Sequence, residues 1–254
     1  GRLPPPAARR RAPIIARAFD RARLLMPRVF TQRCFYLFVA LLGLITVAPF
    51  VIDTELGRVV LTMLNVFVLL ATVAAVGRHT SSFALAVTIA VAIMLLQFFG
   101  MRQGVADFLR AEWWLSVLFY ISAVIYLLGY VMRRDVLTMD KLWGGASVYL
   151  MMGVTWGYAY ALAQSYHPGA FAIGGAPVAE VTKGDLIYFS FTVLTSTGFG
   201  DMYPTRPVAR VLVTLEQILG TLFVAIFIAR LANAYPPPRG GSSRGGGNGS
   251  GDAT

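Results

Sequence analysis

The chain has 254 residues, of which 57% are hydrophobic and 13% are charged, against roughly 25% charged residues in ordinary soluble domains. This composition argues against a soluble globular protein. The net charge of +10 would suit a nucleic-acid-binding protein, but that role leaves the apolar remainder of the chain unexplained. The single cysteine, Cys34, excludes an intramolecular disulfide and a cysteine metal cluster. No nucleophile–base arrangement or zinc-ligand spacing is present, so we predict that the protein is not an enzyme.

The chain begins with a basic segment, residues 1–33, which holds nine arginines ahead of the first apolar run. Cations next to a membrane span hold that end in the cytoplasm and contact anionic lipid headgroups. We therefore predict a cytoplasmic N-terminal segment whose partners are membrane lipids, with no nucleic acid bound.

Six apolar segments follow, each close to the length of about 20 residues that crosses the hydrocarbon core as a helix. They are Phe35–Ile52, Val59–Val76, Phe83–Gly100, Trp113–Met132, Leu142–Ala163 and Val208–Ala229. The fourth contains no ladder of arginines, so a conventional voltage sensor is not expected. The sequence predicts an all-α transmembrane fold with a four-helix region at 34–134, a pore domain at 138–234 and a disordered Gly/Ser-rich cytoplasmic tail at 235–254.

The distribution of basic residues sets the predicted orientation. With six spans and the N-terminus inside, 16 of the 22 lysine and arginine residues fall on the inner side. Both termini are then cytoplasmic in a multi-pass protein of the plasma (cell inner) membrane. His79 and His167 fall in loops of this topology, where we expect solvated side chains.

Between the fifth and sixth spans lies a segment, 182–203, that is apolar but too short and too rich in glycine to cross the membrane. Thr182 with Asp185 three residues later predicts a capping box and a helix that starts at about Lys183 and stops before Gly198. Because this segment starts and ends outside, we predict a re-entrant loop. The C-terminal, negative end of its helix then points at the membrane centre and favours a cation there.

Gly198 and Gly200 lie two positions apart after this predicted helix. Carbonyl groups that all face one axis need alternating left- and right-handed backbone conformations, and glycine adopts the left-handed ones without steric cost. Irregular backbone at membrane depth is tolerated where it lines a water-filled path. Rings of such carbonyls replace the hydration shell of a permeating cation.

The heptad Thr195-Ser196-Thr197-Gly198-Phe199-Gly200-Asp201 resembles the Thr-Thr-Val-Gly-Tyr-Gly-Asp selectivity filter of the potassium channel family. This likeness covers about residues 140–234. With its six predicted spans, the chain resembles a bacterial-type six-helix subunit that lacks voltage-sensor arginines. The likeness implies K⁺ bound by the carbonyls of Ser196, Thr197, Gly198 and Phe199, with Gly200 and Asp201 forming the outer mouth. It also implies Gly220 as a gating hinge in the inner helix, for which the alternative is a small residue packed against a neighbouring helix.

Several residues are predicted to support this filter. They are Tyr188, Phe189, Thr192, Thr195 and Glu216. Phe199 replaces the family's tyrosine and Phe189 its usual tryptophan partner, so we expect packing between apolar groups in place of a hydrogen bond. Glu216, an ionisable group deep in the sixth span, is expected to brace the pore helix by accepting hydrogen bonds from Thr192, Thr195 or Ser196. A pore-facing charge that concentrates cations and a silent protonated group remain the alternatives for Glu216.

The sequence therefore predicts a potassium-selective channel subunit that assembles as a homotetramer, with K⁺ as permeant ion and no other cofactor. The departures at Thr197 and Phe199 leave a weakly selective K⁺/Na⁺ channel as the alternative. A non-conducting accessory subunit or a transporter is a further alternative, although the chain shows no internal repeat of the kind that marks transporters.

Overall fold

The computed structural model describes residues 33–51, 55–76, 84, 87–96, 106–133 and 138–234. The predicted basic segment ahead of residue 33, the predicted tail from residue 235 and His79 lie outside these residues. The division into four regions stays a prediction.

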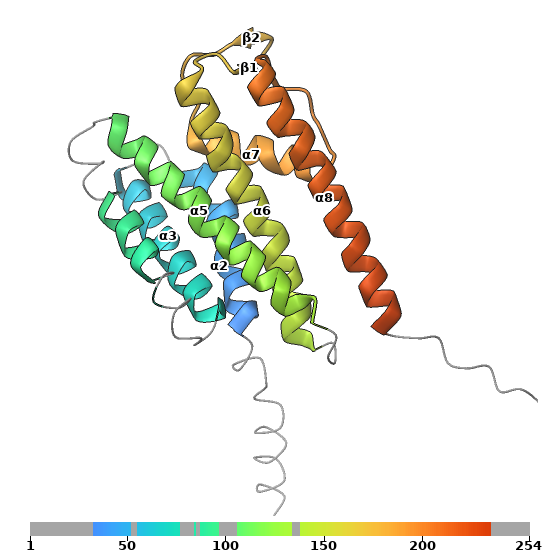
Figure 1. Cartoon of the computed structure of the whole chain (residues 1–254). Helices are drawn as coiled ribbons and strands as arrows, with labels where there is room; N and C mark the ends of the chain where they lie inside the picture. Colours follow the sequence, from blue (N-terminus) through green and yellow to red (C-terminus); the bar gives the residue numbers. More distant parts are fainter. Residues whose placement is uncertain are drawn as a thin grey trace, which may run out of the picture.

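Helices occupy every predicted span, at least in its described part (Figure 1). They are α2 (Arg33–Val51), α3 (Glu55–Val76), a helix at Val87–Leu96, α5 (Ala106–Val131), α6 (Met139–Tyr166), α7 (Lys183–Leu194) and α8 (Pro207–Ala234). α8 begins with Pro207, whose fixed backbone angle suits the first position of a helix. The start of α2 and the last residues of α8 lie on the same side of the molecule, opposite the small sheet (Figure 1).

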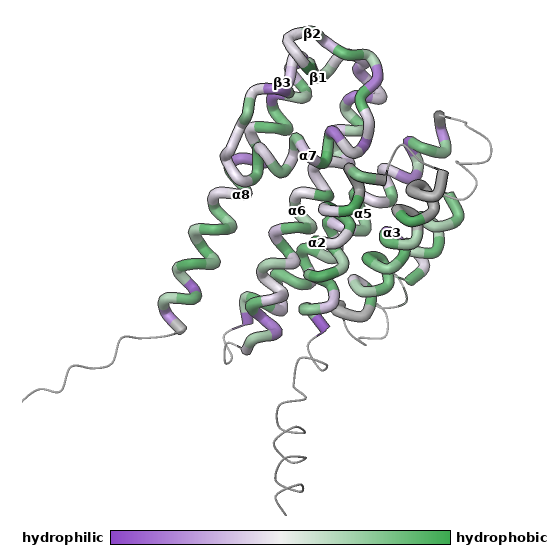
Figure 2. Tube along the Cα trace, turned by 180° about the vertical axis from the view of Figure 1, so that it is seen from behind, coloured by the Kyte–Doolittle hydropathy of each residue, from purple (hydrophilic) through white to green (hydrophobic). Residues whose placement is uncertain are grey.

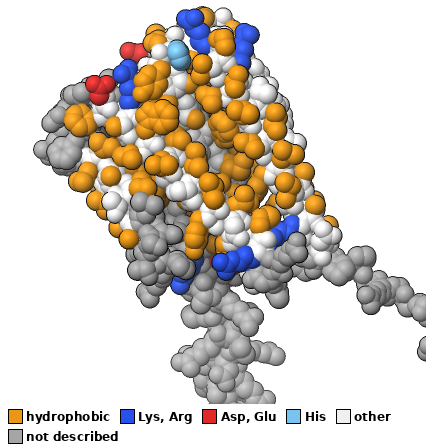
Figure 3. Space-filling model, in the orientation of Figure 1, with side chains coloured by type: hydrophobic (Ala, Val, Ile, Leu, Met, Phe, Trp, Pro, Cys, Tyr) orange, Lys and Arg blue, Asp and Glu red, His pale blue; other side chains and the backbone are white. Residues whose placement is uncertain are grey.

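Two of the described helices are long and apolar enough to cross a membrane, Asp107–Val131 and Pro207–Asn233. Six membrane spans therefore remain a prediction. Apolar residues run along the middle of the helices, with hydrophilic residues gathered towards their ends (Figure 2). The space-filling view likewise shows hydrophobic side chains over the middle of one face, with charged side chains near its upper and lower ends (Figure 3).

α6 is the central helix and contacts α2, α5, α7 and α8. Its glycines allow these neighbours to approach closely, as the spacing Gly153-x-x-x-Gly157 predicts. A Cβ atom placed on Gly153 would lie 2.6 Å from the ring of Phe191 in α7. One placed on Gly157 would lie 2.6 Å from Cγ1 and 2.9 Å from the backbone Cα of Ile187. The two glycines thus allow a close helix contact, and the contacting helix is α7.

Gly157→Ala is expected to destabilise the protein, because the added methyl group meets the backbone of α7 and forces the two helices apart. Overpacking of this kind costs about 1–3 kcal/mol. Gly129→Ala in α5 is the matched control, since nothing lies within 4 Å of a Cβ atom there. Thermal unfolding of the purified variants in detergent checks the pair: a midpoint that falls for Gly157→Ala and not for Gly129→Ala is expected, and equal midpoints would contradict it.

Three short strands correct the predicted all-α fold. They are β1 (Phe171–Ile173), β2 (Ala176–Pro177) and β3 (Met202–Pro204), which form an antiparallel sheet in the order β2-β1-β3. Gly174 and Gly175, both with positive φ, form the turn that joins β1 to β2. β3 pairs with β1 in the register Ile173↔Met202, so the sheet ties the loop after α6 to the chain that follows residue 201. Strands of two or three residues are too short to leave a periodic pattern in the sequence.

Candidate functional site

The short helix α7 begins as its sequence predicts. The side chain of Thr182 accepts a hydrogen bond from the backbone of Asp185, and the Asp185 carboxylate accepts one from the backbone of Thr182. This capping box satisfies two backbone donors at the start of the helix. α7 ends at Leu194, before Gly198, also as predicted.

The backbone after α7 turns its N–H groups back towards the helix. Ser196 N–H donates to Val193 O at 2.9 Å, and the N–H groups of Thr197 and Gly198 donate to Thr192 O at 2.9 Å and 3.1 Å. In the described part of the chain, no donor contacts the carbonyl oxygens of residues 196–199. These oxygens therefore have no hydrogen-bond donor among the described residues and are available to a ligand.

Left-handed conformations recur at every second residue of this segment. The φ angle is 57° at Ser196, 55° at Gly198 and 80° at Gly200. The alternation predicted from the two glycines is confirmed. Ser196 also has a positive φ angle. The sequence did not reveal this, because the left-handed conformation costs a non-glycine residue about 1–2 kcal/mol.

Asp201, predicted at the outer mouth, is held from two sides. Its carboxylate accepts a hydrogen bond from the Tyr188 hydroxyl of α7 at 3.0 Å, and its carbonyl oxygen accepts one from Gly174 N–H of the β1–β2 turn at 3.2 Å. The hydrogen bond to Asp201 raises the pKa of Tyr188, because loss of the proton would place two negative oxygens together. The structure thus links Tyr188 to the segment that it was predicted to support.

The two aromatic residues predicted to pack on each other are apart within the chain. Phe199 is 69% exposed, whereas Phe189 is buried. The Phe189 ring lies 5.6 Å from those of both Tyr160 and Phe171. Within one chain, Phe189 and Phe199 therefore do not support the segment 195–201 by packing on each other. Thr195 Oγ1 instead lies 2.9 Å from Thr197 Oγ1, and Thr195 and Thr192 also donate to carbonyl oxygens within α7.

Glu216 lies behind α7 and is fully buried. Its Oε1 lies 2.5 Å from the Ser190 hydroxyl of α7, and its Oε2 accepts a hydrogen bond from the Tyr160 hydroxyl of α6. Full burial by the chain's own atoms contradicts the alternative of a pore-facing charge. The carboxyl group joins α6, α7 and α8, as a brace would, but its partners are not the predicted Thr192, Thr195 and Ser196.

Gly220, the predicted hinge, is buried against the end of α7. A Cβ atom on Gly220 would lie 2.7 Å from Leu194 Cδ1 and 3.1 Å from Leu194 O. This contact supports the alternative of a small residue packed against a neighbouring helix. α8 is a continuous helix through this position, and its role as a hinge stays a prediction.

Residues 113–235 match a protein family described as ion channel. This part of the chain is similar to an ion channel, and residues 113–235 are called the ion channel module for that reason. The match begins inside α5, upstream of the predicted start at about residue 140, and it contains α6, α7, the segment at 195–201 and α8. A search of the curated proteins found no match, and neither did a search of solved structures.

Three residues of the ion channel module were missed by sequence reasoning. Ser190 and Tyr160 contact Glu216, and the Tyr149 hydroxyl donates to Leu194 O at 3.0 Å, which satisfies a carbonyl at the end of α7. The buried ionisable residue was the available signal, because a carboxyl group at that depth needs hydrogen-bonding partners. Identifying them required the relative rotation of three helices, which the sequence does not display.

Among the described residues, no group of three or more His, Cys, Asp or Glu side chains lies close enough to hold a metal ion. A cation bound to the ion channel module at 195–201 would be held by backbone carbonyl and hydroxyl oxygens. Such oxygens suit a hard cation that is bound weakly enough to leave again.

Proposed function

We propose that the ion channel module conducts potassium passively across a membrane, as a homotetramer in which the carbonyl oxygens of Ser196, Thr197, Gly198 and Phe199 replace the water around the ion. The observation that carries this proposal is the backbone of 196–200. Its N–H groups at 196–198 bond back to α7, its carbonyl oxygens at 196–199 accept no hydrogen bond from the described residues, and its φ angle is positive at every second residue. Four such segments around one axis would form successive oxygen rings.

The surroundings of this segment support the same function. α7 ends at residue 194 with its negative end beside the segment, which favours a cation over an anion. Much of α8 remains uncovered within one chain, including Val211, Leu215 and Leu222. An exposed apolar helix face of this kind suits contact with further copies of the chain or with lipid.

The membrane orientation belongs to the same proposal. The inner side carries 16 of the 22 basic residues, which places both termini in the cytoplasm and the sheet β2-β1-β3 outside. The described start of α2 and end of α8 lie at one end of the molecule, as this topology requires (Figure 1). α5 carries Arg110 as its single basic residue, so we propose gating by a stimulus other than a voltage-sensor helix.

A reversal-potential measurement on the purified protein in planar bilayers tests the proposal. Under opposed potassium and sodium gradients, the current is expected to reverse close to the potassium equilibrium potential. A reversal midway between the two equilibrium potentials would favour a weakly selective cation channel. No current from a protein shown to be folded and tetrameric would overturn the conducting function itself.

A further inference from the structure

The second turn of α5 carries a buried ionisable residue, Glu112, whose side chain is 3% exposed. It belongs to the face of α5 that also buries Ser116, Phe119 and Ala123. Removing a carboxyl group from water costs free energy, so an acidic residue at such a position indicates a specific role. The contacts that hold the segment 195–201 involve other residues, and Glu112 therefore needs a separate explanation.

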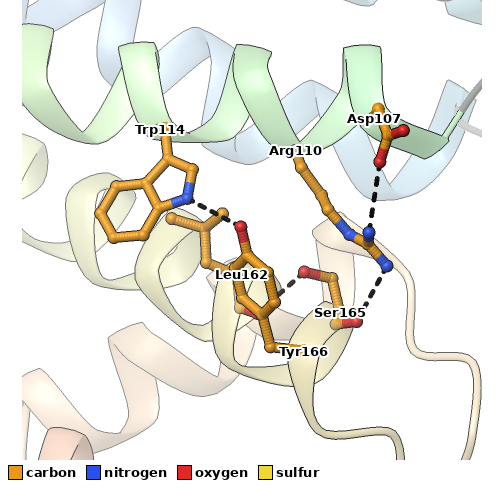
Figure 4. Close-up of polar contacts among 6 residues, drawn as sticks. All are labelled: Asp107, Arg110, Trp114, Leu162, Ser165 and Tyr166. Carbon is orange, nitrogen blue, oxygen red and sulfur yellow. Dashed lines mark hydrogen bonds and ion pairs between the residues drawn. The ribbon is translucent and has the colours of Figure 1, made fainter.

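The turn of α5 that carries Glu112 is fixed on the end of α6 (Figure 4). Arg110 donates a hydrogen bond to Ser165 O at 3.3 Å, and Trp114 Nε1 donates one to the Tyr166 hydroxyl at 3.2 Å. Arg110 and Trp114 lie two positions to either side of Glu112 in the sequence. At about 3.6 residues per turn, Glu112 therefore leaves α5 on nearly the opposite side, where the helix is buried.

Lys183 is the first residue of α7 and lies within electrostatic reach of Glu112. A positive charge in the first turn of a helix opposes the helix dipole, so lysine is an unfavourable residue at this position. Burial lowers the pKa of Lys183, but the neighbouring Tyr158 and Glu112 outweigh burial and raise the pKa. The ammonium group therefore stays charged, and the carboxylate of α5 helps to hold that charge in place.

Tyr158 of α6 joins the helices that surround it. Lys183 Nζ lies 5.1 Å from the centre of its ring, and its hydroxyl accepts hydrogen bonds from Lys183 and from Asn65 of α3. The ring of Tyr120, a buried residue of α5, stacks on the Tyr158 ring with the two centres 6.0 Å apart. Side chains of α3, α5 and α7 therefore meet on one buried residue of α6.

Apolar packing between the starts of α5 and α7 is incomplete. A cavity of about 420 Å³ lies between them, and its lining includes Trp113 of α5 and Leu186 of α7. Trp113 still packs against the hydrophobic core to which Leu186 belongs. Glu112, Tyr158 and Lys183, which we call the outer polar cluster, therefore supply a polar link across a junction that apolar contacts fill only in part.

We propose that Glu112 is a positioning residue, which fixes the start of α7 through the outer polar cluster and so couples α5 to the segment 195–201. α7 is 12 residues long, so its two ends lie about 18 Å apart and a shift at its start is carried to its end. Its end holds the segment through hydrogen bonds from the N–H groups of 196–198 to Thr192 O and Val193 O. The effect on current rests on the proposed function, whereas the effect on α7 does not.

Hydrogen–deuterium exchange of the purified full chain in detergent, followed by mass spectrometry, tests the inference. Glu112→Gln removes the charge with little change in shape. It is expected to speed exchange of the amides at 183–198 about fivefold or more, while exchange in the last turns of α8 stays unchanged. Asp107→Asn, which removes an exposed carboxylate of the same helix outside the cluster, is the matched control and should leave both regions unchanged. Equal acceleration in all helices, as a merely structural role would give, or unchanged exchange at 183–198 would overturn the inference.

Lys183→Met keeps the test valid if Glu112→Gln fails to fold, because the Lys183 side chain is only half-buried. It is expected to speed exchange at 183–198 to a similar extent. Since either change breaks the same interaction, the double variant is expected to match the single variants. Effects that multiply in the double variant would show that the two residues act independently, against the inference.

Single-channel recording in planar bilayers measures the consequence for conduction. Glu112→Gln is expected to lower the open probability about fivefold or more, because a displaced α7 carries the carbonyl oxygens of 196–199 out of register. Asp107→Asn should leave it unchanged. Faster exchange at 183–198 with an unaltered current would contradict the coupling to the segment 195–201. A wild-type chain without current would instead overturn the proposed function, and the exchange measurements would then decide by themselves whether Glu112 positions α7.

Discussion

Glu216→Leu is expected to prevent assembly of a stable oligomer, whereas Glu216→Gln is expected to preserve it. The Ser190 hydroxyl lies 2.5 Å from Glu216 Oε1 and 2.7 Å from Gly153 O, but it has one proton to donate. Both contacts are hydrogen bonds only when Glu216 itself carries a proton and donates it to Ser190, which then donates to Gly153. The neutral acid also accepts from Tyr160 through Oε2 and avoids the cost of a buried charge.

Glutamine reproduces this pattern, because its NH₂ group donates to Ser190 and its carbonyl oxygen accepts from Tyr160. Leucine fills a similar volume but leaves the buried Tyr160 hydroxyl without a partner, at a cost of about 1–3 kcal/mol in each chain. Size-exclusion chromatography and thermal unfolding in detergent measure the effect. The control is Gln217→Leu, one residue along α8 on its exposed side. A stable Glu216→Leu oligomer, or a Glu216→Gln variant that fails to assemble, would show that the hydrogen bonds do not hold the helices as inferred.

The helices and the start of α7 could be predicted because their signals are local. A long apolar run specifies a helix whatever it packs against, and the Thr182–Asp185 pair forms its capping box within four residues of chain. Gly198 and Gly200 likewise adopt positive φ angles as their residue type allows. Each of these predictions rests on properties of one stretch of sequence, and the structure confirms each.

The partners of Glu216 were predicted wrongly for a geometric reason. Thr192 and Ser190 are two positions apart on α7, so their side chains leave the helix about 200° apart, on nearly opposite sides. Depth in the membrane, which the sequence indicates, does not say which side faces α8. The structure turns Ser190 towards Glu216 and lets Thr192 donate to Phe189 O within α7.

The aromatic pair and the sheet show a second limit. Phe189 contacts Phe171 of β1, and β1 pairs with β3 beyond the segment 195–201. Neither contact can be predicted from a local sequence pattern, because both contacts depend on how the loop after α6 folds back over α7. Phe199 is left exposed in one chain, so its surroundings depend on what the assembled protein brings to it.

Gly198→Ala is expected to abolish the preference for potassium over sodium while leaving a folded protein. Gly198 has φ of 55°, a conformation that costs an alanine about 1–2 kcal/mol. Nothing lies within 4 Å of a Cβ atom at this position in the chain, so the effect arises from the backbone and not from a side-chain clash. Relief of the strain rotates the neighbouring peptide groups and turns their carbonyl oxygens away from the proposed ion path.

Gly175→Ala separates this effect from backbone strain in general. Gly175 has φ of 93° and likewise has nothing within 4 Å of a Cβ atom, but it lies in the turn between β1 and β2. Both variants should therefore lose stability, and only Gly198→Ala should shift the reversal potential away from that of potassium. An unchanged reversal potential in Gly198→Ala, or an equal shift in Gly175→Ala, would mean that the carbonyl groups at 196–199 do not select the ion.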